Sequence, residues 1–216
     1  MILEMRAVPP FMKNGFLLGC EITRQGVIID PGDEVDDLLD AAGRHGLSIE
    51  YILLTHAHLD HVTGVARAKE AVGAPVWLHK DDLRLYDAVV QQGLAFGFRV
   101  DPQPAPDFFY EADRRLTFGD YAVRVHHTPG HCPGGVCLQV GRQGEEGRQL
   151  FVGDTLFAGS IGRTDLPGGD YGVLMRSIRD VLMTFPDDYE VYSGHGPVTT
   201  IGEERRTNPF LSVPGA

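Results

Sequence analysis

The chain has 216 residues, 43% of them hydrophobic, and a net charge of −11, so it can bury a sizeable core, and we expect one domain over residues 1–216. The acidic balance argues against nonspecific nucleic-acid binding, which needs clustered lysine and arginine. No apolar stretch is long enough to span a bilayer, and the start of the chain lacks a signal-peptide pattern. Three cysteines without a C-x-x-C pair exclude a closed disulfide framework and favour a reducing compartment, so we expect a cytoplasmic protein.

Short β-rich runs open the chain at 2–8, 15–22 and 26–30. Turn residues separate them, which predicts an antiparallel meander. A helix is predicted over 33–45, because apolar residues recur there at i, i+3, i+4 and i+7 and a glycine follows as a stop signal.

A crossover unit follows, with a strand over 49–55, a helical pattern over 61–72 and a strand over 75–78. The histidine-rich stretch 55–61 therefore stands at the carboxyl end of a strand, where open α/β sheets have their sites. A further helix is predicted to begin at Asp81.

Aromatic residues accumulate between 93 and 110, where no periodicity remains. Two interpretations stay open for this segment: a packed flap near the site, or a surface loop anchored to the core. From 114 onward the chain is β-rich and then helical, with strands predicted at 115–118, 121–127, 136–140, 150–152 and 189–192 and a helix at 170–185. Each half thus has β-rich and then α-rich character, without a clear sequence repeat.

Residues 55–61 read Thr-His-Ala-His-Leu-Asp-His. If the strand stays extended, His56, His58 and Asp60 recur at period two and point to one side. His61 is out of that alternation and needs the chain to turn before it faces the same point. Burying these groups without a cation would cost about 1 to 3 kcal/mol for each unpaired polar group. The stretch therefore predicts a metal site.

Three later positions share one pattern, in which a short apolar strand leads into a glycine-bounded loop that carries a metal-ligand residue. They are His131 in TPGHCPGG, Asp154 in VGDT and His195 in SGHGP. Together with the first stretch they provide five histidines and two aspartates, enough for two divalent ions with one bridging carboxylate. Imidazole and carboxylate ligands suit zinc, iron or manganese, and each ion would keep an open position for water.

The HxHxDH stretch, followed by single ligands in glycine-bounded loops, resembles the metallo-β-lactamase superfamily over nearly the whole chain. TPGHCPGG, GDTLF, GSIGRTDLPGGD, GHGP and the TxGEERRxNPF tail resemble its glyoxalase II-like branch, in particular the short bacterial hydroxyacylglutathione hydrolase-like proteins, which have no C-terminal helical extension. The resemblance implies an α/β fold, a four-layer αβ/βα sandwich of two mixed β-sheets flanked by helices.

The resemblance also implies roles for the ligands. His56, His58 and His131 would hold the first metal, Asp60, His61 and His195 the second, and Asp154 would bridge the two ions. A hydroxide between two divalent ions, zinc above iron or manganese, would attack a hydroxyacyl thioester carbonyl, with Asp60 as the catalytic residue that orients it and accepts its proton.

The expected partner is therefore a small-molecule thioester, with no nucleic acid and no membrane. Arg163 could take the role of the basic residue that helps to bind the thiol carrier in glutathione-using relatives, although carriers other than glutathione stay open. Cys132 lies beside a ligand, but we interpret it as a space-filling residue because hydroxide already supplies the attack. The main alternative is a mononuclear-iron persulfide dioxygenase of the same superfamily, with His56, His131 and Asp154 as iron ligands. A metallo-nuclease and a non-catalytic metal-binding module fit the sequence less well.

Overall fold

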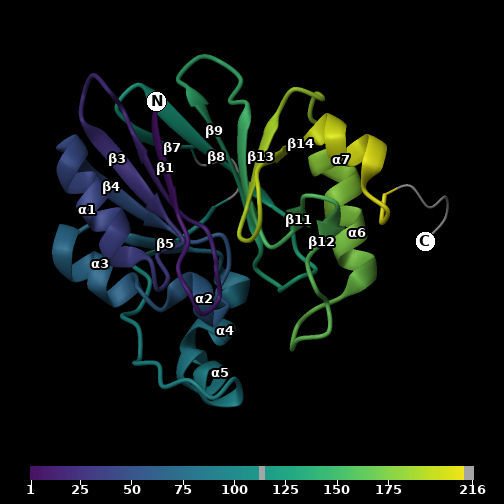
Figure 1. Ribbon diagram of the computed structural model, residues 1–216, viewed down its shortest axis with the longest axis horizontal. Coiled ribbons are helices and arrows are strands. Elements are labelled where there is room, and N and C mark those ends of the chain that lie inside the picture. Colours follow the sequence, from purple (N-terminus) through teal and green to yellow (C-terminus); the bar gives the residue numbers. More distant parts are fainter. Residues whose placement is uncertain (112–114, 212–216) are drawn as a thin grey trace.

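Two six-stranded sheets face each other in the computed structural model, which describes residues 1–111 and 115–211 (Figure 1). The first sheet has the order β1-β2-β3-β4-β5-β6: Ile2–Arg6, Gly15–Gly19, Gln25–Ile29, Ser48–Leu53, Val76–Leu78 and Phe108–Phe109. Its first three strands form the predicted antiparallel meander, and its last four run parallel.

The second sheet has the order β14-β13-β10-β9-β8-β7: Thr199–Thr200, Glu190–Ser193, Gln149–Gly153, Val136–Arg142, Tyr121–His127 and Arg115–Phe118. Its neighbours are antiparallel except β10 and β13, which run parallel. A small separate hairpin joins β11 (Leu156–Phe157) to β12 (Ser160–Ile161).

Helices flank both sheets. On the first sheet, α1 (Val35–His45) and α3 (Val65–Val72) cover the outer face, and α2 (Leu59–Val62), α4 (Leu83–Asp87) and α5 (Val89–Ala95) lie below the sheets in Figure 1. On the second sheet the helices are α6 (Tyr171–Asp180) and α7 (Ile201–Thr207). Within residues 1–111 and 115–211, every helix is too short or too polar to cross a membrane.

The apolar side chains form three clusters that correspond to the three boundaries between these four layers. Along β2, Leu17 packs on the helix side, whereas Phe16 and Leu18 point to the other sheet. On β10, Phe151 points between the sheets, while Leu150 packs under α6. This period-two alternation in strands that are apolar on both faces is what a doubly covered sheet requires. The predicted αβ/βα sandwich is therefore confirmed.

Several predicted element boundaries were wrong. The helix expected over 61–72 is divided into α2 and α3, because the Gly64 N–H leaves the helical pattern to donate to the carbonyl of Pro31 at 3.0 Å. The helix expected over 170–185 ends at Asp180 and continues only as a 3₁₀ turn, Leu182–Thr184, before Pro186. Helix α7 was missed, although Thr200 caps it by accepting from the Glu203 N–H at 3.1 Å.

The segment between 93 and 110 corresponds to the anchored loop rather than to the packed flap. The rings of Phe96, Phe98, Phe108 and Phe109 are between 37% and 47% exposed. The segment is held by its polar groups: Gln103 accepts from the Ala66 N–H, and Tyr86 donates to the carbonyl of Pro104. Tyr110 is its buried aromatic residue, and the Tyr110 hydroxyl donates to the carbonyl of Leu54, just before the histidine-rich stretch.

Candidate metal centre

The predicted ligands lie together at one edge of the two sheets, where four strands end. His56 and His58 follow β4, and Asp60 and His61 lie on α2. The remaining three come from loops after β8, β10 and β13, namely His131, Asp154 and His195. The structure thus brings all seven predicted ligands to one place.

His56, His58 and His131 form a first group, whose ligand nitrogens all lie within 4.8 Å of one another. The Nδ1 atom of His58 is 2.7 Å from the Nε2 atom of His131. On its far side, His131 donates from Nδ1 to the carbonyl of Arg163 at 2.8 Å. That hydrogen bond fixes the tautomer of His131, so its Nε2 lone pair faces the centre.

Asp60, His61 and His195 form the second group. The Nε2 atom of His195 is 3.1 Å from Oδ2 of Asp60. Asp154 lies between the groups: its Oδ1 is 3.4 Å from Nε2 of His61, and its Oδ2 is 3.6 Å from Nε2 of His131. One carboxylate therefore reaches both groups, as a bridging ligand must.

Three buried polar atoms that point into this cluster have no hydrogen-bond partner within the described part of the chain. They are Nε2 of His56, Nε2 of His61 and Oδ1 of Asp154. An unpaired polar group of this kind costs about 1 to 3 kcal/mol, and three in one place are rare in a folded protein. A cation bound among them would satisfy all three, so these residues fit a divalent metal ion.

The charges of the cluster favour the same conclusion. Burial is the main cause that lowers the pKa values of His56 and His58, that of His58 to about 3, and neighbouring histidines add to the effect. Both imidazoles are therefore neutral, which is the form that binds metals. Burial would also lower the pKa of His61, but the carboxylates of Asp60, Asp154 and Asp30 outweigh it and raise the value to about 10.

The carboxylates of the cluster stay ionised. Burial alone would raise the pKa of Asp154, but attraction to His61 outweighs it and holds the pKa below the usual range of an aspartate. The pKa of Asp60 is lowered for the same reason. The centre therefore attracts positive charge, which either a proton on His61 or a metal ion can provide.

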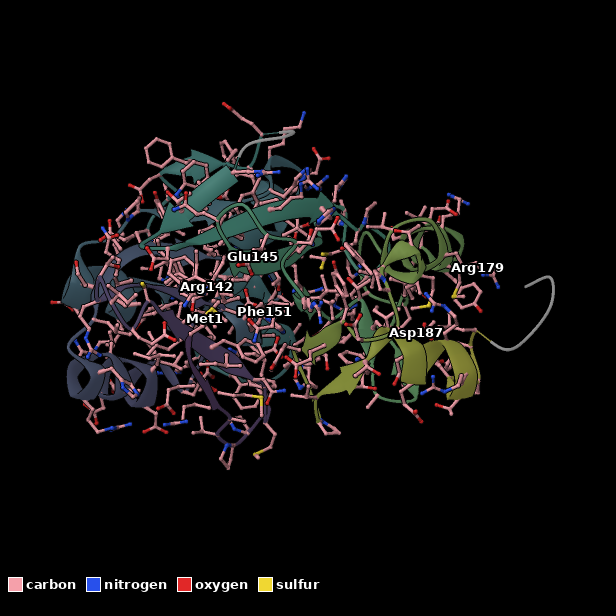
Figure 2. All side chains as sticks on the ribbon, turned by 90° about the horizontal axis from the view of Figure 1, so that it is seen from above. Met1, Arg142, Glu145, Phe151, Arg179 and Asp187 are labelled. Atoms are coloured by element: carbon pink, nitrogen blue, oxygen red, sulfur yellow. The ribbon has the colours of Figure 1, made fainter. Side chains whose placement is uncertain are left out.

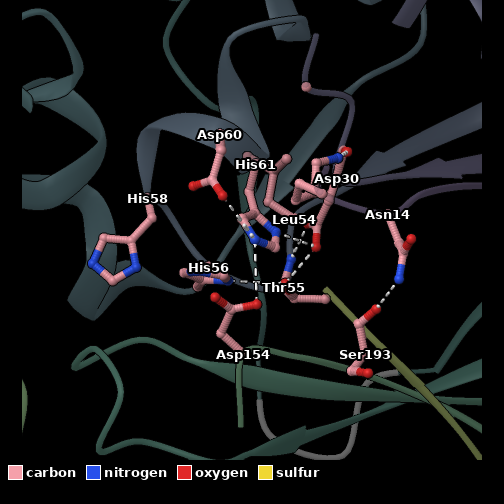
Figure 3. Close-up of polar contacts among 12 residues, drawn as sticks. Asn14, Asp30, Leu54, Thr55, His56, His58, Asp60, His61, Asp154 and Ser193 are labelled. Atoms are coloured by element: carbon pink, nitrogen blue, oxygen red, sulfur yellow. Dashed lines mark hydrogen bonds and ion pairs between the residues drawn. The ribbon is translucent and has the colours of Figure 1, made fainter. Parts of the chain in front are cut away.

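Asp30 was not predicted as a site residue, yet it is buried directly behind the ligands. Its Oδ2 atom accepts from Nδ1 of His61 at 2.9 Å and from the Thr55 hydroxyl, and its Oδ1 accepts from the Thr55 N–H at 2.6 Å (Figure 3). These bonds orient His61 so that Nε2 faces Asp60 and Asp154. A signal was present in the sequence, because Asp30 follows β3 in the same way that Asp154 follows β10.

Asp82 is a second residue that sequence reasoning missed. Its side chain is fully buried and accepts from the N–H groups of Ala57 at 3.0 Å and Gly134 at 2.6 Å. It also accepts from the Cys132 thiol at 3.2 Å. One carboxylate therefore holds the backbone between His56 and His58 and the backbone just after His131.

The His195 loop is attached to the first half of the molecule by residues near the N-terminus. The side-chain amide of Asn14 donates to the carbonyls of Ser193 at 3.0 Å and Gly196 at 2.9 Å. Gly194 is required here, because a Cβ at this position would lie 2.2 Å from Oδ1 of Asp154. The loop thus approaches the bridging carboxylate more closely than any side chain at position 194 would allow.

The loop that carries Asp30 and Gly32 is held by a buried ion pair between Lys13 and Glu34, both at most 2% exposed. Lys13 also donates to the carbonyl of Asp30, and Glu34 accepts from the Gly32 N–H at 2.9 Å.

Arg163, the predicted substrate-binding residue, lies beside the centre but faces away from it. Its carbonyl orients His131, while its guanidinium is mostly exposed and makes a two-point ion pair with Asp165 at 2.7 Å for both bonds. Substrate binding by Arg163 stays a prediction, and it would require the side chain to exchange Asp165 for the substrate.

An αβ/βα sandwich with a histidine and aspartate cluster at the sheet edge defines a class of metal-binding proteins. The sequence profile of the metallo-β-lactamase superfamily matches residues 8–195, and the chain belongs to this superfamily.

Similar proteins span its full length. The chain is 36% identical over 214 residues to the hydroxyacylglutathione hydrolase GloC of Haemophilus influenzae, covering 98% of this chain and 99% of that protein. A solved structure titled BLEG-1 B3 metallo-β-lactamase is 36% identical with a TM-score of 0.88, covering 98% of this chain and 100% of the other. The solved structure of TTHA1623 in a di-iron-bound form is 42% identical with a TM-score of 0.84, and the match covers 96% of this chain and 100% of the other. The solved structure of ETHE1 from Myxococcus xanthus is 28% identical with a TM-score of 0.79, and the match covers 98% of this chain and 85% of the other.

Proposed function

We propose that this protein is a metal-dependent hydrolase of the glyoxalase II type that cleaves a small hydroxyacyl thioester with two divalent metal ions. The position of Asp154 carries the proposal, since its two oxygens reach histidines of both ligand groups. The likeness to GloC supports the reaction type, and the di-iron form of TTHA1623 supports two metals in such a site. Zinc is the metal that we expect, with iron or manganese able to replace it.

His56, His58 and His131 would hold one ion, Asp60, His61 and His195 the other, and Asp154 both. Bound in this way, the two ions would supply Lewis acidity, which would lower the pKa of a water molecule at the centre and would polarise the substrate carbonyl. Asp60 is ionised and 3.1 Å from His195, so it is available to orient the attacking water and to accept its proton. Thiolate leaves without a strong general acid, so no further acid is required at the sulfur.

A cleft of about 380 Å³ provides room for the substrate. It lies between α4 and the loop that holds Pro167 and Gly168, and it includes Pro133, two residues after His131. Leu85 and Ala88 make one wall apolar, and Arg84 adds a guanidinium with no ion-pair partner in residues 1–111 and 115–211. We propose that an anionic group of the thiol carrier binds Arg84, alongside or instead of Arg163.

The first experiment measures metal content and turnover together. The chain is purified without added metal, its zinc, iron and manganese are quantified, and release of glutathione from S-lactoylglutathione is followed with a thiol reagent. We expect two metals per chain and turnover that a chelator removes and zinc restores. Two metals with no turnover of this substrate or of other hydroxyacyl thioesters would contradict the hydrolase.

The second candidate is a persulfide dioxygenase that holds one iron with His56, His131 and Asp154. Its support is the likeness to ETHE1 together with the 3.6 Å approach of Asp154 to His131. One iron per chain and oxygen uptake with a persulfide would favour this candidate over the hydrolase. The second ligand group favours the hydrolase, because a single iron leaves Asp60, His61 and His195 without a role.

We also propose a cytoplasmic protein that acts on a small molecule rather than on nucleic acid or membrane. Its three cysteines are all buried and unpaired, which suits a reducing compartment. Fractionation of cells that express the chain, with a cytoplasmic marker enzyme as the control, would test the location.

A further inference from the structure

A second cleft, of about 460 Å³, lies on the outer face of the second sheet, away from the metal edge. Arg115, Arg124, Gln139 and Leu150 are direct neighbours across β7, β8, β9 and β10, so their side chains point to the same face. Leu150 on that face is covered by α6, as is Cys137 farther along β9, whereas Arg115, Arg124 and Gln139 line the cleft. The cleft is thus the part of this face that the helices leave open.

Ala122 and Gly141 pair beside the arginines, and two segments form the walls of the cleft. Gly141 lets one of these segments approach the sheet closely, because a Cβ there would lie 2.2 Å from Cα of Gly147. The turn between β9 and β10 folds over one side: the Gln139 amide donates to the carbonyl of Gly147 at 2.9 Å. Phe185 and Tyr189 from the segment after α6 form the other side, stacked with ring centres 5.2 Å apart.

The floor of this cleft is basic, whereas its border carries two carboxylates, Glu145 and Glu146, of which Glu146 accepts from the Tyr189 hydroxyl at 3.2 Å. Arg115 and Arg124 stand directly across from each other, and neither guanidinium has an ion-pair or hydrogen-bond partner among residues 1–111 and 115–211. Arg142 lies at the rim, but its guanidinium is 5.6 Å from the centre of the Tyr121 ring, on the opposite face of the sheet, so it adds no charge to the floor of the cleft. Figure 2 shows Arg142 near Glu145, at the turn that borders the cleft. Like charges directly opposite each other in a sheet are destabilising. This chain has a net charge of −11, so a pair of facing arginines is unusual on its surface and calls for a role.

We propose that this cleft binds the phosphate group of a small ligand, independently of the metal centre. Two planar guanidinium forks side by side match the several oxygens of a phosphate, and their combined charge exceeds what one carboxylate would neutralise. The volume is within the range of small-molecule sites. The metal ligand Asp154 follows the carboxyl end of β10, whereas the cleft lies beside the start of that strand, so the two sites occupy opposite ends.

The test uses the metal-loaded full chain and three probes: inorganic phosphate, pyrophosphate and citrate. Binding is measured by calorimetry, and its place by the amide NMR signals of Ala122 and Gly141. The variant is Arg115→Gln/Arg124→Gln, and the matched control is Arg44→Gln/Arg99→Gln, which removes two exposed arginines elsewhere. We expect pyrophosphate to shift both signals saturably and to bind at least about tenfold more weakly to the variant, with no change in the control.

Binding of an anion at the metals would be equal in all these proteins, so the difference between variant and control isolates the cleft. Absence of saturable shifts at Ala122 and Gly141, equal affinity of wild type and variant, or shifts with citrate alone would each overturn the proposal. If the glutamine variant fails to fold, Arg115→Lys/Arg124→Lys replaces it, because it keeps both charges but loses the planar forks. Unchanged pyrophosphate affinity in that variant would also overturn the proposal.

Discussion

The half of the chain around the first sheet contributes its ligands from the single stretch 56–61, whereas the half around the second sheet contributes His131, Asp154 and His195 from three separate loops. In the first half, Asp30 of the same half holds both Thr55 and His61. In the second half, the carbonyl of Arg163 holds His131, but the His195 loop is held by Asn14, which belongs to the first half. Asp154 reaches histidines of both halves. The halves therefore differ in that a ligand loop of the second half depends on a residue of the first.

The largest effect is expected where the halves meet. Asp154→Asn keeps the shape of the side chain but removes the charge that attracts both ions. We expect the metal content to fall from two ions to one or none per chain and turnover to fall by at least about a thousandfold. This loss exceeds the roughly 10- to 100-fold loss of activity that follows when a residue hydrogen-bonded to a metal ligand is replaced. Metal analysis and the thioester assay measure both quantities. Two metals with near-normal turnover would show that Asp154 does not bridge.

A loss of stability is expected at the buried ion pair that holds the loop carrying Asp30. Lys13→Met leaves the buried carboxylate of Glu34 without its cation, which costs about 3 to 5 kcal/mol in the free energy of unfolding. Urea unfolding of the metal-free protein measures this loss. The control is Arg67→Met, which breaks an exposed ion pair with Asp36 and should cost less than about 1 kcal/mol. Equal losses in the two variants would contradict the structural role of Lys13.

A smaller effect is expected when the hydrogen bond between Asp30 and His61 is weakened. The Thr55 hydroxyl and the Nδ1 atom of His61 both donate to one carboxylate oxygen of Asp30. In Asp30→Asn an amide N–H₂ can stand in place of that oxygen, so the tautomer of His61 is no longer fixed. We expect the affinity for metal to fall by about 10- to 100-fold without unfolding. Competition with a chelating dye measures the affinity. Asp33→Asn is the control, because the exposed Asp33 side chain on the same loop accepts only from Thr63 within the described residues, and it should leave the metal affinity unchanged.

The sequence was most informative where the site is contiguous. Residues 56–61 could be recognised because four ligand residues follow one strand, and Asp154 and His195 follow the same strand-end pattern. Asp30 obeys that pattern too and could have been found. Asp82 could not, because its role arises from Ala57, Cys132 and Gly134, which tertiary packing brings to it.

The layers of the fold were expected from the resemblance to the metallo-β-lactamase superfamily, but the ends of the helices were not correctly predicted. The break between α2 and α3 depends on the bond from Gly64 to Pro31, which joins residues distant in sequence. Helix α7, in contrast, has a local signal in Thr200 and Glu203, the S/T-x-x-E pattern of a capping box. Tertiary contacts therefore explain the first error, and an overlooked local pattern explains the second.

The smallest effect is expected at Cys132, next to the ligand His131. Its thiol is fully buried and donates to Asp82, and burial raises its pKa well above the usual range, so it is held as a neutral donor rather than a nucleophile. Cys132→Ser provides a hydroxyl for the same bond, and we expect turnover within about twofold of the wild type, since no reacting group is lost. Cys137→Ser is the matched control: the Sγ of Cys137 is buried with no hydrogen-bond partner in the described residues, so its hydroxyl should cost about 1 to 3 kcal/mol of stability. Loss of turnover in Cys132→Ser with stability and metal content intact would instead make Cys132 part of the chemistry and would move a catalytic role into the second half of the chain.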